Sequence, residues 1–179
     1  MGAGYHARPM SVLTRDCILR ELDEGRIRID PFDRSQVGVA SIDLTLGREI
    51  RTIENGPVPI RVEDGIDYRE HTRVLALDRP FRLDPGVTIH GITEELITLP
   101  DDLCGFLEGR SRFARLGLMI HVTSAFVQPG VSNRQVLEMS NVSSRALEIV
   151  PGVRICQIVL MRTEGRAVYR GRFQDQREI

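Results

Sequence analysis

The chain contains no lysine and no tryptophan, and both absences narrow the chemistry open to it. Without lysine there is no Schiff-base nucleophile and no P-loop lysine, so phosphate contacts would use the planar donor fork of arginine. Genomic base composition explains the missing lysine equally well. With only 5% aromatic residues, a stacking platform for single-stranded nucleic acid is not expected. The formal net charge of −1 favours neither nucleic acid nor an anionic membrane as a partner.

Cysteines and long apolar runs are also scarce. Cys17, Cys104 and Cys156 are far apart and form no C-x-x-C pair, so neither disulfides nor a structural zinc site is expected, and a cytoplasmic location fits. No apolar run approaches the roughly 18 residues of a membrane-spanning helix. Residues 1–9 precede Met10 and are predicted to be a disordered tag remnant or extended start; they lack the apolar region of a signal peptide.

Several familiar catalytic signatures are missing as well. The zinc deaminase pattern H-x-E…P-C-x-x-C is absent. So are a Walker A loop, G-x-G-x-x-G and H-E-x-x-H. We therefore expect any chemistry to proceed without zinc and without metal ligands from protein side chains.

The patterning predicts one mainly β domain with an N-terminal helix. Residues 14–24 read as a helix, with Thr14 as N-cap, Ile18 and Leu22 on one face, and Gly25 just beyond its end. Residues 42–46 alternate apolar and polar side chains, which predicts a strand that ends at Gly47. Further short apolar runs cover residues 74–77, 87–92, 96–99, 104–107, 119–122, 136–139, 147–150 and 155–161.

Turn residues separate these runs about every 8–12 residues, which favours a β-sandwich or barrel over βαβ units. Residues 111–116 are predicted to form a short helix, and the charged segment 55–72 a surface excursion. The polar, arginine-rich tail from residue 169 onward is predicted to be flexible until a ligand binds it.

One stretch near the middle of the chain holds the residue types of a hydrolytic nucleotide site. Ser111 and Arg115 share a helix face, and Arg112 adds a guanidinium. Glu138 is flanked by apolar residues, and burial would raise its pKa and suit it to general-base work. Each feature has a structural alternative: a helix cap, a solvated basic face, a solvent-facing strand position. His121 lies in an apolar strand and is interpreted as a core or interface histidine.

The same stretch resembles the dCTP deaminase family, relatives of the trimeric dUTP diphosphatases. The resemblance is carried by GRSRFARLG at 109–117, HVT at 121–123, Pro129-Gly130, VLE at 136–138, ASIDLTLG at 40–47, Leu99-Pro100, EGRS at 108–111, RICQ at 154–157, and Tyr169, Gly171, Arg172, Phe173 and Gln176. It runs in order from Met10 to Gln176.

The resemblance implies a distorted β-barrel (dUTP diphosphatase-like) over residues 10–168, followed by a phosphate-closing tail at 169–179. The barrel would carry an N-terminal helix and a short active-site helix, and would form a homotrimer with active sites between subunits. The activity implied is zinc-free hydrolytic deamination of dCTP to dUTP and ammonia.

Residue roles follow by similarity. Glu138 would be the general base, Ser111 and a backbone carbonyl near Ser124 would hold the water, and Arg115 would stabilise developing charge. The substrate-binding set implied is Arg110, Arg112, Val122, Thr123, Ser124, Gln128, Val136, Gln157, Tyr169, Arg172 and Gln176. Mg²⁺ would be chelated by the substrate triphosphate, and dTTP is a candidate inhibitor.

Some positions depart from the family pattern. Gln128 replaces the usual Asp under the deoxyribose, which argues against diphosphatase activity; Val131 and Asn133 replace a bulky aromatic and a glycine; Arg112 replaces a small hydroxyl. Alternatives therefore stay open: a diphosphatase or bifunctional enzyme forming dUMP, a non-catalytic nucleotide-binding protein, or a deaminase of a variant cytosine or a ribonucleotide.

Overall fold

The computed structural model describes residues 11–121 and 123–179; the predicted extended start at 1–9 lies outside them. The helical elements are α1 (Arg15–Asp23), η1 (Arg34–Gln36), η2 (Tyr68–His71) and α2 (Ser111–Ala114). The strands are β1 (Arg28–Asp30), β2 (Ile42–Ile53), β3 (Thr72–Ala76), β4 (Phe81–Leu83), β5 (Thr88–Thr98), β6 (Leu103–Gly109), β7 (Leu118–Ile120), β8 (Phe126–Val127), β9 (Ser132–Asn141), β10 (Leu147–Ile149) and β11 (Arg154–Arg162).

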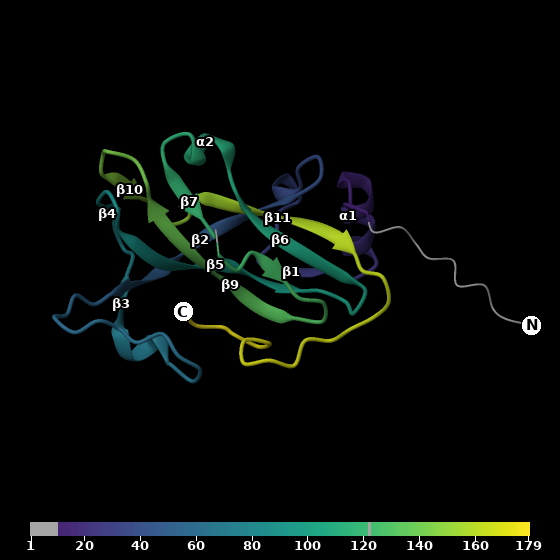
Figure 1. Cartoon of the computed structure of the whole chain (residues 1–179). Coiled ribbons are helices and arrows are strands. Elements are labelled where there is room, and N and C mark those ends of the chain that lie inside the picture. Colours follow the sequence, from purple (N-terminus) through teal and green to yellow (C-terminus); the bar gives the residue numbers. More distant parts are fainter. Residues whose placement is uncertain (1–10, 122) are drawn as a thin grey trace, which may run out of the picture.

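Most strands belong to one strongly curled antiparallel sheet (Figure 1). Its order is β7-β9-β5-β2-β11-β6-β8, with β1 added on β5 and β3 on β2, while β10 and β4 form a small separate sheet. Apolar side chains fill the inside of the curl, among them the fully buried Ile42, Leu44 and Ile158. The predicted mainly β, barrel-like fold is therefore confirmed.

The N-terminal helix agrees with its sequence signals except at its cap. α1 begins after Thr14, but the threonine hydroxyl bonds the Asp16 carboxylate and not a backbone N–H. Ile18 is fully buried. Gly25 takes a positive φ of 67° just past the helix and donates its N–H to the Leu22 carbonyl, as a C′ glycine does.

Gly47 does not end its strand, so that prediction was wrong. β2 runs through it to Ile53, and the register with β5 shifts between Leu46 and Ile50. A Cβ at Gly47 would lie 3.0 Å from the Ile92 carbonyl oxygen. The glycine therefore permits close approach of two strands at a bulge.

The two apolar runs at 87–92 and 96–99 also prove to be one strand. β5 runs through the polar residues between them, and the buried Thr93 and Glu95 side chains both have hydrogen-bond partners. Glu95 is 1% exposed and accepts hydrogen bonds from the Thr45 N–H and the Gln36 amide. A buried polar group of this kind interrupts the hydrophobic pattern without interrupting the strand.

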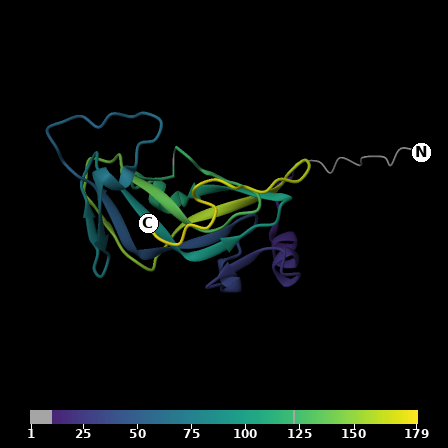
Figure 2. The ribbon, with the colours of Figure 1, turned by 90° about the horizontal axis from the view of Figure 1, so that it is seen from below.

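Two surface segments, the loop at 54–67 and the C-terminal tail, lie on the same side of the curled sheet (Figure 2). The loop at 54–67 is largely exposed, as expected, and leads into η2, which carries Tyr68. The tail packs along the end of β9: Tyr169 donates to the Pro129 carbonyl, and Arg134 to that of Gln176. The flexibility of this tail stays a prediction.

Cys17, Cys104 and Cys156 are free thiols. Within the described residues, no helix is long and apolar enough to cross a membrane.

Candidate functional site

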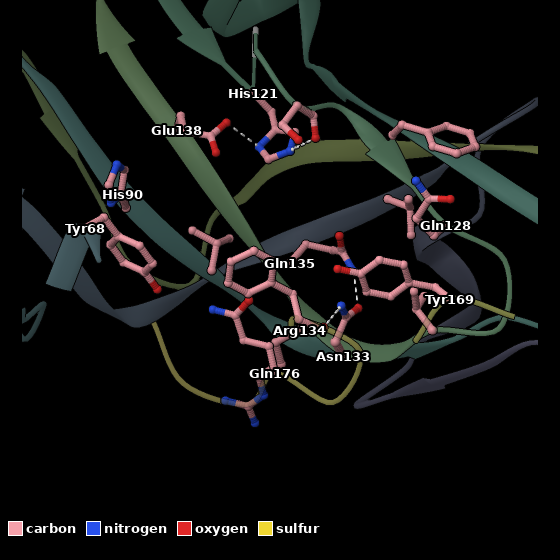
Figure 3. Close-up of a pocket in the computed structure, with 16 residues that line it drawn as sticks. Tyr68, His90, His121, Gln128, Asn133, Arg134, Gln135, Glu138, Tyr169 and Gln176 are labelled. Atoms are coloured by element: carbon pink, nitrogen blue, oxygen red, sulfur yellow. Dashed lines mark hydrogen bonds and ion pairs between the residues drawn. The ribbon is translucent and has the colours of Figure 1, made fainter. Parts of the chain in front are cut away.

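A cavity of about 440 Å³ opens beside β9 (Figure 3). Its volume falls within the usual range of small-ligand pockets. η2, β5, the segment after β7, β9 and the tail all contribute to its wall. The lining residues are Tyr68, His90, His121, Ser124, Phe126, Val127, Gln128, Val131, Asn133, Arg134, Gln135, Val136, Glu138, Tyr169, Phe173 and Gln176.

Glu138 lies in this wall, held by His121. The His121 Nδ1 is 3.0 Å from the carboxylate Oε2, an ion-pair distance without hydrogen-bond alignment. Burial alone would raise the pKa of Glu138, but interactions led by its close contact with His121 outweigh burial and lower that pKa below the ordinary glutamate value. The expected upward shift was therefore wrong in sign. Glu138 is ionised at neutral pH, which is the form that accepts a proton.

His121 is held beside Glu138 in a strained backbone conformation. His121 follows β7 with a positive φ of 59°, which is uncommon for a residue with a side chain. Its N–H donates to the Glu138 carbonyl at 2.8 Å, and its Nε2 lies 2.7 Å from the Ser124 carbonyl oxygen. His121 is buried as expected, but the prediction that it lies in a strand was wrong: β7 ends at Ile120, and the His121 ring faces the glutamate (Figure 3). Backbone strain of this kind is typical of functional sites.

Two buried amides form the opposite part of the wall. The Gln135 amide donates to the Asn133 side-chain oxygen at 2.6 Å, and the Asn133 amide donates to the Phe173 carbonyl of the tail at 2.7 Å. Both side chains belong to residues only 8% exposed. The sequence singled out Asn133 but missed Gln135, Tyr68 and His90, because strand register and a distant loop bring them to the cavity.

A second depression is lined by four of the other predicted residues: Arg110, Ser111, Arg112 and Gln157. It is lined by Gly38, Val39, Ala40, Ser41, Asp43, Arg110, Ser111, Arg112, Gln157 and Val159. Arg110 reaches Asp43 at 3.1 Å and also donates to the Arg154 carbonyl. The Ser41 hydroxyl donates to the Gln157 side-chain oxygen at 2.6 Å.

The predicted site residues thus fall into two groups within one chain. Ser124, Gln128, Val136, Glu138, Tyr169 and Gln176 share the cavity, whereas Arg110, Ser111, Arg112 and Gln157 share the second depression. Arg115 ends α2 and is exposed. Thr123 lies beside Glu138, its hydroxyl 3.5 Å from Oε2, and Arg172 pairs with Asp67 on the surface at 2.8 Å. Val122 lies outside the described residues.

Metal ligands are not gathered anywhere in the described part of the chain. No group of three or more His, Cys, Asp or Glu side chains there could hold a metal ion.

Residues 12–163 match the family model described as dCTP deaminase-like. The chain belongs to this family. Its dCTP deaminase-like relatives include proteins named "dCTP deaminase, dUMP-forming". The one from Streptomyces coelicolor is 40% identical over 169 residues, covering 89% of this chain and 88% of that protein. The one from Parafrankia sp. is 38% identical over 169 residues, covering 89% and 84%.

Solved structures show the same dCTP deaminase-like fold. A 2'-deoxycytidine 5'-triphosphate deaminase from Agrobacterium tumefaciens aligns with a TM-score of 0.69 at 20% identity, covering 87% of this chain and 49% of that one. The chain therefore spans about half the length of that structure. A dUTPase mutant from phage phi11 of S. aureus aligns with a TM-score of 0.53 at 10% identity, covering 82% and 96%. At these identities the likeness concerns the fold alone.

Proposed function

We propose that this protein is an enzyme that deaminates dCTP by hydrolysis. The observation that carries the proposal is the Glu138 carboxylate in the wall of a cavity of about 440 Å³, 3.0 Å from the His121 Nδ1, in a chain 38–40% identical to proteins named dCTP deaminase. Glu138 takes a proton from water, and the resulting hydroxide adds to cytosine C4. As hydroxide adds, the electron pair of the C4–N3 double bond moves to N3. The proton held by Glu138 then passes to the amino group, which leaves as ammonia, while the hydroxyl proton moves to N3, so the base becomes uracil.

The residues around Glu138 are suited to hold the reacting groups. The Ser124 carbonyl lies on the same side of the cavity and can accept a hydrogen bond from the attacking water. Backbone groups of Val122, Thr123 and Ser124 are proposed to read the pyrimidine edge, and Val136 to pack against the base. Ser111 is the second proposed ligand of the water, and Arg115 the cation that stabilises negative charge as it develops.

One chain alone does not assemble this site. Glu138 lines the cavity, whereas Ser111 lines the second depression and Arg115 is exposed at the end of α2. We propose a homotrimer in which α2 of one copy faces the Glu138 cavity of its neighbour. Each active site would then draw its base and its cation from different copies.

The triphosphate is proposed to lie between the two residue groups. Arg110, Arg112 and Gln157 from one side, and Tyr169, Arg172 and Gln176 of the tail from the other, would contact it. Mg²⁺ enters with the phosphates, whose oxygens are the hard ligands that it prefers. In this arrangement Arg172 exchanges its exposed partner Asp67 for phosphate, which costs little because exposed ion pairs are weak. dTTP would compete for the same contacts.

The final product has two candidates. Deamination alone gives dUTP, and Gln128 favours this outcome because a carboxamide cannot take a proton from water as a carboxylate can. The relatives named dUMP-forming favour a second step that releases pyrophosphate. Gln128 is exposed in the cavity, so its role at the sugar is open to a direct test.

Incubation with dCTP, CTP, dCMP and dUTP, each with Mg²⁺, tests the function. Ammonia with dUTP or dUMP from dCTP is the expected result, and pyrophosphate distinguishes the two products. Turnover of dUTP alone would make the protein a diphosphatase. Calorimetric binding of dCTP by the folded protein without ammonia release would make it a non-catalytic nucleotide-binding protein.

A further inference from the structure

His90 is a titratable side chain of the cavity that the proposed mechanism does not use. It stands on β5 directly opposite Glu138 of β9 in the antiparallel register. Directly opposed residues point to the same face of a sheet. The His90 ring meets Tyr68 edge-on, with ring centroids 6.0 Å apart and an interplanar angle of 79°. The two polar side chains form one corner of the cavity (Figure 3), hereafter the His90–Tyr68 corner.

The environment of His90 makes it a neutral hydrogen-bond donor. Burial lowers its pKa and Arg51 adds to this effect, while Glu138 opposes it. Its Nδ1 is enclosed and has no hydrogen-bond partner among the described residues. A buried N–H without a partner is rarer in proteins than a buried acceptor without one, so we place the ring proton on Nε2. The nitrogen that the cavity can reach then carries an N–H.

The sheet order defines which edge of a bound cytosine meets this corner. β9 lies between β7 on one side and β5 on the other. Thr123 and Ser124 follow β7, and the proposed function assigns them the hydrogen-bonding edge of the pyrimidine, which in cytosine runs from the C4 amino group through N3 to O2. With C4 at Glu138, the other ring neighbour of C4, which is C5, must point towards β5 and His90.

We propose that the His90–Tyr68 corner selects cytosine nucleotides that carry a hydroxyl-bearing substituent at C5. The inference rests on the proposed deamination at C4. A hydroxyl accepts from the His90 Nε2–H, and it can exchange a second hydrogen bond with the Tyr68 phenol. A methyl group would leave the imidazole donor unpaired, and a carboxylate would be repelled by Glu138.

The test compares kcat/KM for dCTP, 5-methyl-dCTP and 5-hydroxymethyl-dCTP. The hydroxymethyl nucleotide is expected to exceed the other two by about tenfold or more, because a site built around a hydrogen bond discriminates against ligands that lack it. His90→Leu should bring the three values together. His90→Gln, which keeps an N–H near the Nε2 position, should retain the preference, and Tyr68→Phe should weaken it. His71→Leu, on η2 outside the cavity lining, is the matched control.

The outcomes separate this inference from the proposed function. Deamination of dCTP with equal kcat/KM for all three nucleotides would overturn the inference alone. If no nucleotide is deaminated, the proposed function fails, and calorimetric binding of the same nucleotides decides the inference. Tighter binding of 5-hydroxymethyl-dCTP that His90→Leu abolishes would support the His90–Tyr68 corner; equal affinities would overturn it.

Discussion

Glu138 lies between two histidines that affect it differently. His121 contacts the carboxylate and lowers its pKa, whereas His90 stands opposite Glu138 on the neighbouring strand and its own pKa is lowered by burial. If Glu138 is the base, Glu138→Gln keeps the shape and polarity of the side chain but cannot accept a proton. Turnover should fall by about 10²–10⁴-fold, while calorimetric affinity for dCTP changes little. Glu49→Gln, an exposed position on β2, is the control; activity retained in Glu138→Gln would remove Glu138 as the base.

The pH profile tests what His121 does for Glu138. The base must be ionised, so kcat/KM falls as the pH drops through the pKa of Glu138, and a lowered pKa extends activity to lower pH. His121→Gly removes the imidazole while tolerating the positive φ at this position. Burial then dominates, the pKa of Glu138 rises, and the acid limb of the profile should move to higher pH. If the acid limb of the profile stays at the same pH while kcat changes, His121 acts only through the backbone conformation and not on the pKa of Glu138.

At the scale of elements, α1 is joined to the barrel by a buried carboxylate. The Glu21 side chain is 6% exposed and accepts from Arg162 of β11 at 2.6 Å and from Arg26 at 2.7 Å. Burial alone would raise the pKa of Glu21, but these two hydrogen bonds outweigh it and lower the pKa below the ordinary value. The resulting stability is present above the unfolded pKa and is lost as the pH falls through the folded one.

Glu21→Gln should therefore destabilise the protein by about 1–3 kcal/mol at pH 7, measured by urea unfolding. The difference from wild type should shrink as both are titrated to acid through the lowered pKa of the native Glu21 carboxylate, where that carboxylate becomes protonated. Asp23→Asn is the matched control on the same helix, because its pair with Arg34 is 60% exposed on both sides and contributes little. An equal loss in both variants would contradict this account.

Local patterns predicted the helix and most strands, but not how the strands join. Apolar periodicity places α1, β6, β11 and the start of β2 to within a few residues, since each depends on neighbours in the chain. The continuity of β2 through Gly47, and of β5 across Glu95, depends on a strand that approaches from elsewhere. The site residues also divide into those that a local motif predicts and those that only strand pairing brings to the cavity. Glu138 and Ser111 carry recognisable motifs, whereas His90 reaches the cavity only through its register with β9.

For the whole molecule, the two separate groups of site residues are the central feature. If each active site combines Glu138 of one copy with Arg115 of another, two inactive variants should complement each other. Glu138→Gln and Arg115→Ala trimers, each inactive alone, are mixed in equal amounts and allowed to exchange subunits. Random assortment gives each site a one-in-four chance of receiving both native residues, so about a quarter of wild-type activity should return in a cyclic assembly.

The control for this experiment is a double variant, Glu138→Gln with Arg115→Ala, mixed with wild type. In that mixture random assortment lowers the activity from a half to about a quarter of wild type if the sites are shared between copies, whereas the activity stays at a half if one chain holds both residues. Light scattering coupled to size-exclusion chromatography establishes the number of copies before and after mixing. If the mixture of single variants stays inactive and the mixture with the double variant keeps half of the wild-type activity, the base and the cation belong to one chain. Arg115 would then have to reach the Glu138 cavity by movement of α2, which contacts β7 beside the segment that carries His121.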